Sequence, residues 1–273
     1  MSYISKTARG FKALNFGTTA TGKTASIATL LLAGQKVRFL SADNNAEAGI
    51  NAGLKLHNYT PEENQLCIHI PSRPQPEQAD ILASIDAMLN VDFDVYLKGK
   101  DKNRKKQKGF YNIYSGAVNF VDTLSGFDCG AVADWGTDTT FVIDSLSVVC
   151  QEIKMTVCGS QQPSLPQYGA MQGFLQGFVS HITNLGCNVV LLAHPTKETD
   201  EVTGATRIYP LNIGKAMNEQ FASNFSDCIY SQFDGKKYFW ATKHRTAVCS
   251  GRNVPIKDEL DQDYRQFFDK VSD

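Results

Sequence analysis

The sequence has no apolar run that approaches the roughly 18 residues needed to cross a membrane. Its N-terminus, Met1 to Lys6, lacks the apolar core of a secretory signal peptide. Neither a membrane-spanning segment nor a secretion signal is therefore expected. We predict a cytoplasmic protein with no membrane partner.

Two further shortages limit the classes of function. The seven cysteines are scattered, and no two of them have the Cys-x-x-Cys spacing of a zinc site or a redox pair. An odd, scattered set predicts reduced thiols rather than a disulfide framework. The net charge is only -1, so a nucleic-acid contact would have to come from a local basic patch.

The sequence does contain a regular alternation of apolar strands and amphipathic helices. With 273 residues, 42% of them hydrophobic, the chain has enough apolar surface for a sizeable core. Predicted strands cover residues 12–16, 37–41, 67–70, 140–144 and 188–193, and predicted helices cover residues 24–33, 46–56, 77–89, 147–157 and 171–185. This order is typical of an α/β fold, with a largely parallel sheet flanked by helices on both faces.

Other segments have a different character. Asp234-Gly235, between predicted strands at 228–233 and 237–243, indicates an antiparallel hairpin at one edge of the sheet. Residues 110–124 favour a return to helix, and the polar residues 197–204 predict a mobile loop. The charged C-terminal end is expected to be helical or frayed.

A Gly-rich segment between the first strand and the first helix fits the pattern G-x-x-x-x-G-K-S/T in full. It comprises Gly17, Thr18, Thr19, Ala20, Thr21, Gly22, Lys23 and Thr24. In such a loop the glycines let main-chain N–H groups wrap around phosphate oxygens. The lysine reaches the β- and γ-phosphates, and the threonine hydroxyl binds Mg²⁺. We predict ATP and Mg²⁺ as cofactors, although the motif alone accepts other nucleoside triphosphates.

Asp144 is the last residue of the predicted strand 140–144. Its carboxylate is expected at the carboxyl edge of the sheet, beside the phosphate loop. There it would hold the Mg²⁺ shell, partly through water. The alternative is a helix N-cap, because a predicted helix follows. The two roles are compatible, and we predict the metal role.

Hydrolysis also needs a group that orients or deprotonates the attacking water. Asp43 follows the second strand and Glu47 lies one helical turn later, so either carboxylate is a candidate. His194 closes the strand 188–193 and is predicted to sense the γ-phosphate. The alternatives are helix capping by Asp43, a solvated Glu47, and a histidine that caps the turn before Pro195.

Together these residues resemble the RecA-like branch of P-loop ATPases, which includes RecA-type recombinases, DnaB-type helicases and KaiC-like proteins. Recombinases have glutamine in place of His194 and glutamate in place of Asp43, so the shorter carboxylate implies slow hydrolysis. Lys243 and Arg245 are similar to the Lys-x-Arg pair that some of these proteins insert into a neighbour's active site. The resemblance thus implies a homo-oligomer, ring or filament, with shared active sites. The alternative is that both cations lie on a solvated edge strand.

The chain is also similar to phage nucleotide-binding proteins, which include the Sak-type single-strand annealing ATPases. This likeness rests on the strand end Leu191 to His194 and on the segment 196–215 that follows it. It implies a single RecA-like ATPase domain over residues 1–257, with a basic insert at 98–108 and a charged tail at 258–273. The setting would be the cytoplasm of a bacterial host.

DNA contacts are predicted at three places. Residues 98–108 hold seven basic residues and one acidic residue, which suits salt-dependent phosphate binding, although a solubilising insert has the same composition. The other places are the loops 158–167 and 196–212, where RecA-like proteins commonly bind DNA. We predict a DNA-stimulated ATPase that binds single-stranded DNA in recombination, annealing or repair. A helicase or loader motor and a KaiC-like non-DNA switch are the alternatives.

Overall fold

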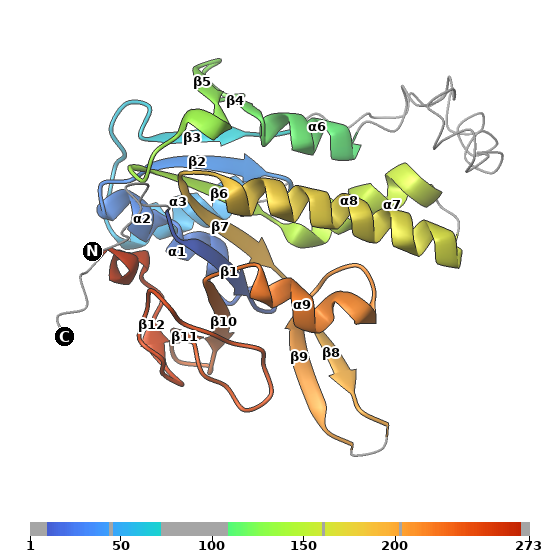
Figure 1. The fold of residues 1–273 in the computed structure, drawn as a ribbon. Helices are drawn as coiled ribbons and strands as arrows, with labels where there is room; N and C mark the ends of the chain where they lie inside the picture. Colours follow the sequence, from blue (N-terminus) through green and yellow to red (C-terminus); the bar gives the residue numbers. More distant parts are fainter. Residues whose placement is uncertain (1–9, 44–45, 72–108, 160–161, 202–203, 269–273) are drawn as a thin grey trace, which may run out of the picture.

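The computed structural model describes residues 10–43, 46–71, 109–159, 162–201 and 204–268 of the chain. The predicted helix 77–89 and the basic run 98–108 lie outside the described residues, as does a part of each predicted DNA-binding loop. In the described ranges, a central sheet carries helices on both of its faces (Figure 1).

Eight strands form the central sheet, in the order β12-β11-β10-β1-β7-β6-β2-β3. They are β1 (Lys12–Phe16), β2 (Lys36–Ser41), β3 (Leu66–His69), β6 (Thr139–Asp144), β7 (Asn188–Ala193), β10 (Asp227–Phe233), β11 (Tyr238–Ala241) and β12 (Leu260–Asp261). All neighbours from β10 to β3 pair in parallel, whereas β11 and β12 pair antiparallel at one edge. The predicted largely parallel sheet with an antiparallel edge is confirmed.

Helices and two small hairpins complete the fold. The helices are α1 (Lys23–Ser26), α2 (Ala28–Leu32), α3 (Ala46–Leu56), α6 (Gly109–Gly116), α7 (Leu146–Cys158), α8 (Leu165–Asn184) and α9 (Asn218–Ser223), with short 3-10 helices η3 (Val132–Asp134), η4 (Lys215–Met217) and η5 (Tyr264–Phe267). The hairpins pair β4 (Asn119–Val121) with β5 (Asp128–Ala131) and β8 (Pro195–Thr199) with β9 (Thr206–Pro210). None of the helices described is long and apolar enough to cross a membrane.

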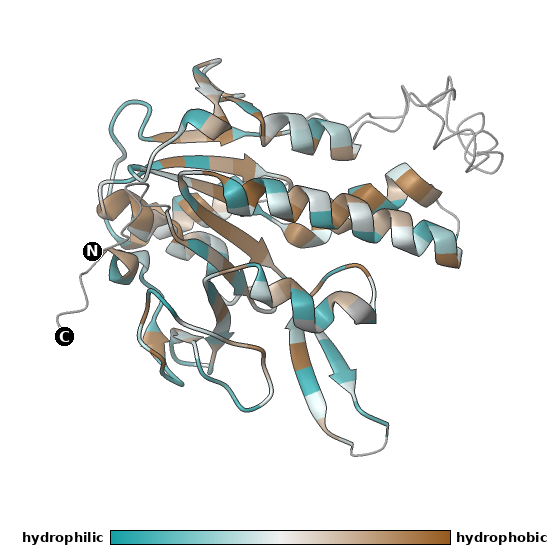
Figure 2. Ribbon diagram, in the orientation of Figure 1, coloured by the Kyte–Doolittle hydropathy of each residue, from teal (hydrophilic) through white to brown (hydrophobic). Residues whose placement is uncertain are grey.

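Alternate residues of the parallel strands face two separate hydrophobic cores. In β7, Val189 and Leu191 pack into the core that includes side chains of α6, α7 and α8. Val190 and Leu192 pack into the core that includes side chains of α2, α3 and η5. Because both faces are covered, β7 is a continuous apolar run from Val189 to Ala193 rather than an alternating one. Figure 2 shows β7 as a largely hydrophobic ribbon.

Residues 110–124 do not form one helix, so that prediction is wrong. α6 ends at Gly116, which lies so close to His69 that a Cβ atom there would be 2.6 Å from the imidazole ring. The chain then turns into β4, where Phe120 is fully buried with its ring centroid 6.1 Å from that of Phe141. These tertiary contacts override the local helical preference.

Residues 197–204 also differ from the predicted mobile loop. The described ones lie in the β8–β9 hairpin, which starts directly after His194 and projects from the sheet (Figure 1). The register pairs Thr199 with Thr206, and their hydroxyl groups are 3.2 Å apart. Most side chains toward the hairpin turn are polar and exposed. The strands therefore lack the apolar alternation from which a strand is normally predicted.

The described part of the C-terminal segment, residues 258–268, packs against the core. Leu260 and Asp261 form β12, which pairs with β11, and η5 follows. Tyr264 is fully buried, and its ring centroid lies 4.7 Å from that of Trp240. Because charged residues surround these apolar ones in the sequence, composition alone indicates a tail.

Candidate nucleotide-binding site

The carboxyl ends of neighbouring parallel strands meet at one edge of the sheet. The register pairs Phe16 with Ala193, Leu192 with Asp144, and Asp144 with Ser41. The strand ends β1, β7, β6 and β2 are therefore nearly level. The residues that follow them, and so lie at the same edge, are the loop 17–24, His194, Ser145 and Asp43.

The phosphate loop, residues 17–24, follows β1, includes the first two residues of α1 and depends on its two glycines. A Cβ atom on Gly17 would collide with the carbonyl oxygen of Ser231. Gly22 has a φ of 81°, in the left-handed region that favours glycine. Both positions hold the loop in a tight turn, with residues 18–20 exposed to solvent.

Lys23 is buried inside the phosphate loop. Its Nζ donates hydrogen bonds to the carbonyl oxygens of Gly17 and Thr18, both at 2.7 Å. Burial lowers the pKa of Lys23 to about 8, and the charge of Asp144 opposes that shift. The ammonium group therefore lies within the loop, where a phosphate group would compensate it directly.

Thr24 and Asp144 form the second half of the site. The Thr24 hydroxyl donates a hydrogen bond to Asp144 Oδ2 at 2.7 Å. Burial raises the pKa of Asp144 to about 6; the Thr24 hydrogen bond opposes this shift, the Asp43 charge adds to it, and the Lys23 charge opposes it. A cation next to Asp144 would lower this pKa and favour the ionised carboxylate.

The pair Thr24 and Asp144 fits a magnesium ion that is shared with phosphate oxygens. Mg²⁺ commonly takes one or two carboxylates and completes its coordination with phosphates and water. The described residues contain no cluster of three His, Cys, Asp or Glu side chains suited to a metal, so the protein alone forms no metal cage there. Ser145, rather than Asp144, is the N-cap residue of α7. Its buried hydroxyl makes no hydrogen bond to any of the described residues. When bound, Mg²⁺ would neutralise charge on the β- and γ-phosphates.

Asp43 is better placed at the site than Glu47. Its backbone N–H donates to the carbonyl oxygen of Asp144 at 3.0 Å. Its carboxylate acts on the pKa of Asp144, which burial chiefly raises, and on the pKa of His194, which burial chiefly lowers. Glu47 lies in the first turn of α3 and acts on neither of these values.

His194 follows β7 and is half-buried beside the phosphate loop. Burial and the charge of Lys23 lower its pKa, and the Asp43 carboxylate opposes them. The imidazole is therefore neutral near pH 7. Its ring makes no hydrogen bond to any described residue, so no side-chain bond supports the turn-capping alternative. Its backbone carbonyl accepts from the N–H of Leu211 at 2.7 Å, which closes the β8–β9 hairpin onto the site.

Lys243 and Arg245 lie on an exposed turn after β11, beyond the end of the strand. His244 anchors this turn, because its Nδ1 accepts hydrogen bonds from the N–H groups of Thr246 at 3.2 Å and Ala247 at 3.0 Å. Neither cation acts on the pKa of Lys23, Asp144 or His194. The role of Lys243 and Arg245 toward a neighbour stays a prediction.

The C-terminal segment supports the phosphate loop through contacts that the sequence pattern did not indicate. The Gln262 side chain donates hydrogen bonds to the carbonyl oxygens of Thr21 at 2.9 Å and Phe239 at 3.1 Å. The Tyr264 hydroxyl accepts a hydrogen bond from Asn15 Nδ2 at 2.9 Å. The one signal in the sequence was Asn15 itself, a polar residue inside the apolar strand β1.

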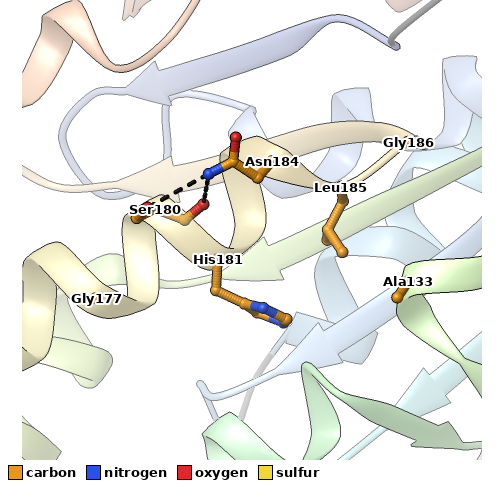
Figure 3. A pocket seen from close by; sticks show the side chains of 7 residues that line it. All are labelled: Ala133, Gly177, Ser180, His181, Asn184, Leu185 and Gly186. Carbon is orange, nitrogen blue, oxygen red and sulfur yellow. Dashed lines mark hydrogen bonds between the residues drawn. The ribbon is translucent and has the colours of Figure 1, made fainter. Parts of the chain in front are cut away.

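A separate hollow of about 440 Å³ lies at the C-terminal end of α8 (Figure 3). Because β7 begins at Asn188, this hollow lies toward the amino edge of the sheet, opposite the phosphate loop. The Asn184 amide donates to the carbonyl oxygen of Ser180 at 2.8 Å, and His181 Nε2 is 2.9 Å from the carbonyl oxygen of Ala117. Its polar side chains thus bond to the protein itself, and nothing there suggests chemistry.

A known family matches most of the chain. The family model described as AAA domain covers residues 9–253. The chain belongs to the AAA domain family. The match makes it a P-loop ATPase, and an AAA domain implies nucleotide binding, usually with Mg²⁺. No curated protein matches the chain, and the likeness to Sak-type annealing ATPases stays a prediction.

The affinity for Mg²⁺·ATP is expected to be greatest between about pH 6 and about pH 8. Below this window, protonation of Asp144 removes the anion that favours Mg²⁺. Above it, deprotonation of Lys23 removes the cation that favours the phosphates. On the acid limb below about pH 6 and the alkaline limb above about pH 8, the affinity approaches an about tenfold loss per pH unit, because one proton is exchanged on each limb. Isothermal titration calorimetry across this range measures both limbs.

The control for the acid limb is Asp144→Asn. Protonation of ATP itself affects both proteins equally, so the difference between them reports the titration of Asp144. An acid limb of the same steepness in both proteins would contradict the assignment.

If Asp43 orients or deprotonates the attacking water, replacing it by asparagine is expected to lower kcat about 10²- to 10⁴-fold. Mg²⁺·ATP affinity should change little, because Asp43 does not hold the phosphates. Glu47→Gln is the matched control and is expected to retain most of the activity. Single-turnover hydrolysis measures the effect. Equal losses in the two variants would show that Asp43 has no special role.

Proposed function

We propose that the protein is a Mg²⁺-dependent ATPase that acts as a homo-oligomer on single-stranded DNA, in recombination, annealing or repair. The observation that carries the proposal is the position of Lys23, Asp144, Asp43 and His194 at one edge of the sheet. These residues offer a cation for phosphate, a metal ligand, a carboxylate for water and a neutral histidine. ATP hydrolysis requires groups of these kinds.

In the proposed reaction, the Lys23 ammonium binds the β- and γ-phosphates, and Thr24 and Asp144 would hold Mg²⁺, which would neutralise charge on these phosphates. Asp43 orients the water that attacks the γ-phosphorus and accepts its proton, and the bond to the β-phosphate oxygen breaks to leave ADP and phosphate. The neutral ring of His194 donates a hydrogen bond to the γ-phosphate. Loss of that phosphate would then release His194.

The β8–β9 hairpin supports the DNA part of the proposal. It begins at the residue after His194, and Leu211 at its return end bonds to the His194 carbonyl. A ligand that moves the hairpin would therefore also move His194, which is proposed to contact the γ-phosphate. Lys197 and Arg207 are exposed on the hairpin. Tyr209 is buried, so it is not available to stack on a base.

A nucleotide-dependent switch that does not bind DNA is a second candidate function. Glu198, Asp200 and Glu201 share the hairpin segment with its two basic residues, so the hairpin has no excess of positive charge. A surface that binds phosphates normally neutralises several of them with Lys and Arg. DNA binding would then depend on the basic run 98–108, outside the described residues.

Exposed cations support the proposed oligomer. Lys243 and Arg245 form no ion pair within the described residues, and the His244 hydrogen bonds hold the turn between them in place. Two such cations are able to offset the charge that develops on a neighbour's γ-phosphate. The active site would then be complete only between subunits.

ATP hydrolysis measured with and without single-stranded DNA tests the proposal. The wild type is expected to hydrolyse ATP slowly and to be stimulated by DNA. Lys23→Ala and Arg245→Ala are each expected to lose about 10²-fold or more of the rate, whereas Arg252→Ala, at another exposed arginine, retains it. Mixing the two inactive variants should restore part of the activity, since some interfaces then combine an intact loop with an intact arginine.

Each negative result separates a part of the proposal. A rate that DNA does not change, with no DNA retention at low salt, would remove the DNA function and favour the switch. Absence of any recovery in the mixture would remove the shared site. Strand displacement on a forked duplex would indicate the helicase or loader alternative.

A further inference from the structure

Two large aromatic side chains stack on each other in solvent at the antiparallel edge of the sheet. Phe233 ends β10 and Tyr238 begins β11, and the two residues are paired across the strands. Their ring centroids are 4.6 Å apart with an interplanar angle of 28°, and the residues are 46% and 51% exposed. Neither belongs to the two hydrophobic cores, so core packing does not account for them.

The Tyr238 ring lies directly against the phosphate loop. A Cβ atom on Gly22 would be 3.2 Å from Tyr238 Cδ1 and 3.4 Å from its Cγ. Gln262, which bonds to the carbonyl oxygens of Thr21 and Phe239, packs against the same glycine. An exposed aromatic platform is therefore joined to the loop that would carry the phosphates.

The sheet order determines which side of the loop is open to the nucleoside. β1 lies between β7 and β10, with β6 and β2 beyond β7 and with β11 beyond β10. Asp144 and Asp43, the proposed metal ligand and the proposed catalytic carboxylate, are on the β6 and β2 side, so the γ-phosphate of a bound nucleotide would be directed there. The other end of the nucleotide then extends toward β10 and β11, where Phe233 and Tyr238 lie.

We propose that Tyr238 stacks on the nucleobase of the bound nucleotide and that Phe233 supports the Tyr238 ring from its other face. This inference rests on the proposed nucleotide binding at the phosphate loop. Base–aromatic stacking uses the face of the base, so it is tolerant of base identity. The pair thus contributes affinity for the nucleoside part of the ligand rather than for its phosphates.

Calorimetric binding of two probes, Mg²⁺·ATP and Mg²⁺·tripolyphosphate, separates base contacts from phosphate contacts. Tyr238→Ala is expected to weaken ATP binding about 10- to 100-fold and to leave tripolyphosphate binding unchanged. Tyr238→Phe keeps an aromatic ring and should bind ATP almost as the wild type does. Tyr111→Ala, at a residue of α6 that is 66% exposed, is the matched control and should bind both probes normally.

Two results would overturn the inference. One is wild-type ATP affinity in Tyr238→Ala, as expected if the pair instead contacts a neighbouring subunit or DNA. The other is an equal loss of both probes, which would mean that Tyr238 only shapes the loop. If the proposed nucleotide binding at the phosphate loop is itself wrong, the result differs: Lys23→Ala would then bind both probes as tightly as the wild type does.

A measurement on the wild type avoids any dependence on how the variants fold. The fluorescence of 2-aminopurine riboside triphosphate is quenched when its base stacks on an aromatic ring. We expect strong quenching on binding to the wild type. Bound nucleotide with the emission of the free nucleotide would contradict the stacking.

Discussion

The parallel register of the central sheet is the constraint on which the candidate site depends. Strands β1, β2, β6 and β7 end nearly level, so the residues that follow them meet although they are far apart in the chain. Thr24 and Asp144, for example, are 120 residues apart and share a hydrogen bond. The two cores maintain this register, because a slip of one residue would turn every strand side chain toward the opposite core. The fold therefore positions the site through its packing.

The same burial gives the site its electrostatic character. Lys23 and Asp144 carry opposite charges when ionised. Burial lowers the pKa of Lys23 to about 8 and raises the pKa of Asp144 to about 6. Buried charges destabilise a protein unless they are paired and hydrogen-bonded. A bound triphosphate with Mg²⁺ would supply a partner for both groups at once. The arrangement thus favours the bound state most when both residues are ionised.

Local patterns in the sequence predicted the helices and strands that depend mainly on the apolar pattern of neighbouring residues. The helix 46–56 and the strand 188–193 have the predicted bounds, because their apolar patterns are regular. The level strand ends could also be predicted, although the roles of the residues there remain predictions. Gln262 and Tyr264 could not be found in this way. Their hydrogen bonds reach Thr21 and Asn15, 241 and 249 residues away in the chain, and leave no periodic trace in the sequence.

The central claim is that Thr24 and Asp144 together hold the metal of a bound nucleotide. Its most direct test is the gain in ATP affinity that Mg²⁺ gives to the wild type, compared with the gain in Thr24→Val, which removes the hydroxyl and keeps the shape of the side chain. We expect similar affinities for metal-free ATP in the two proteins and a gain from Mg²⁺ that is largely lost in the variant. The same gain from Mg²⁺ in both proteins would contradict the claim.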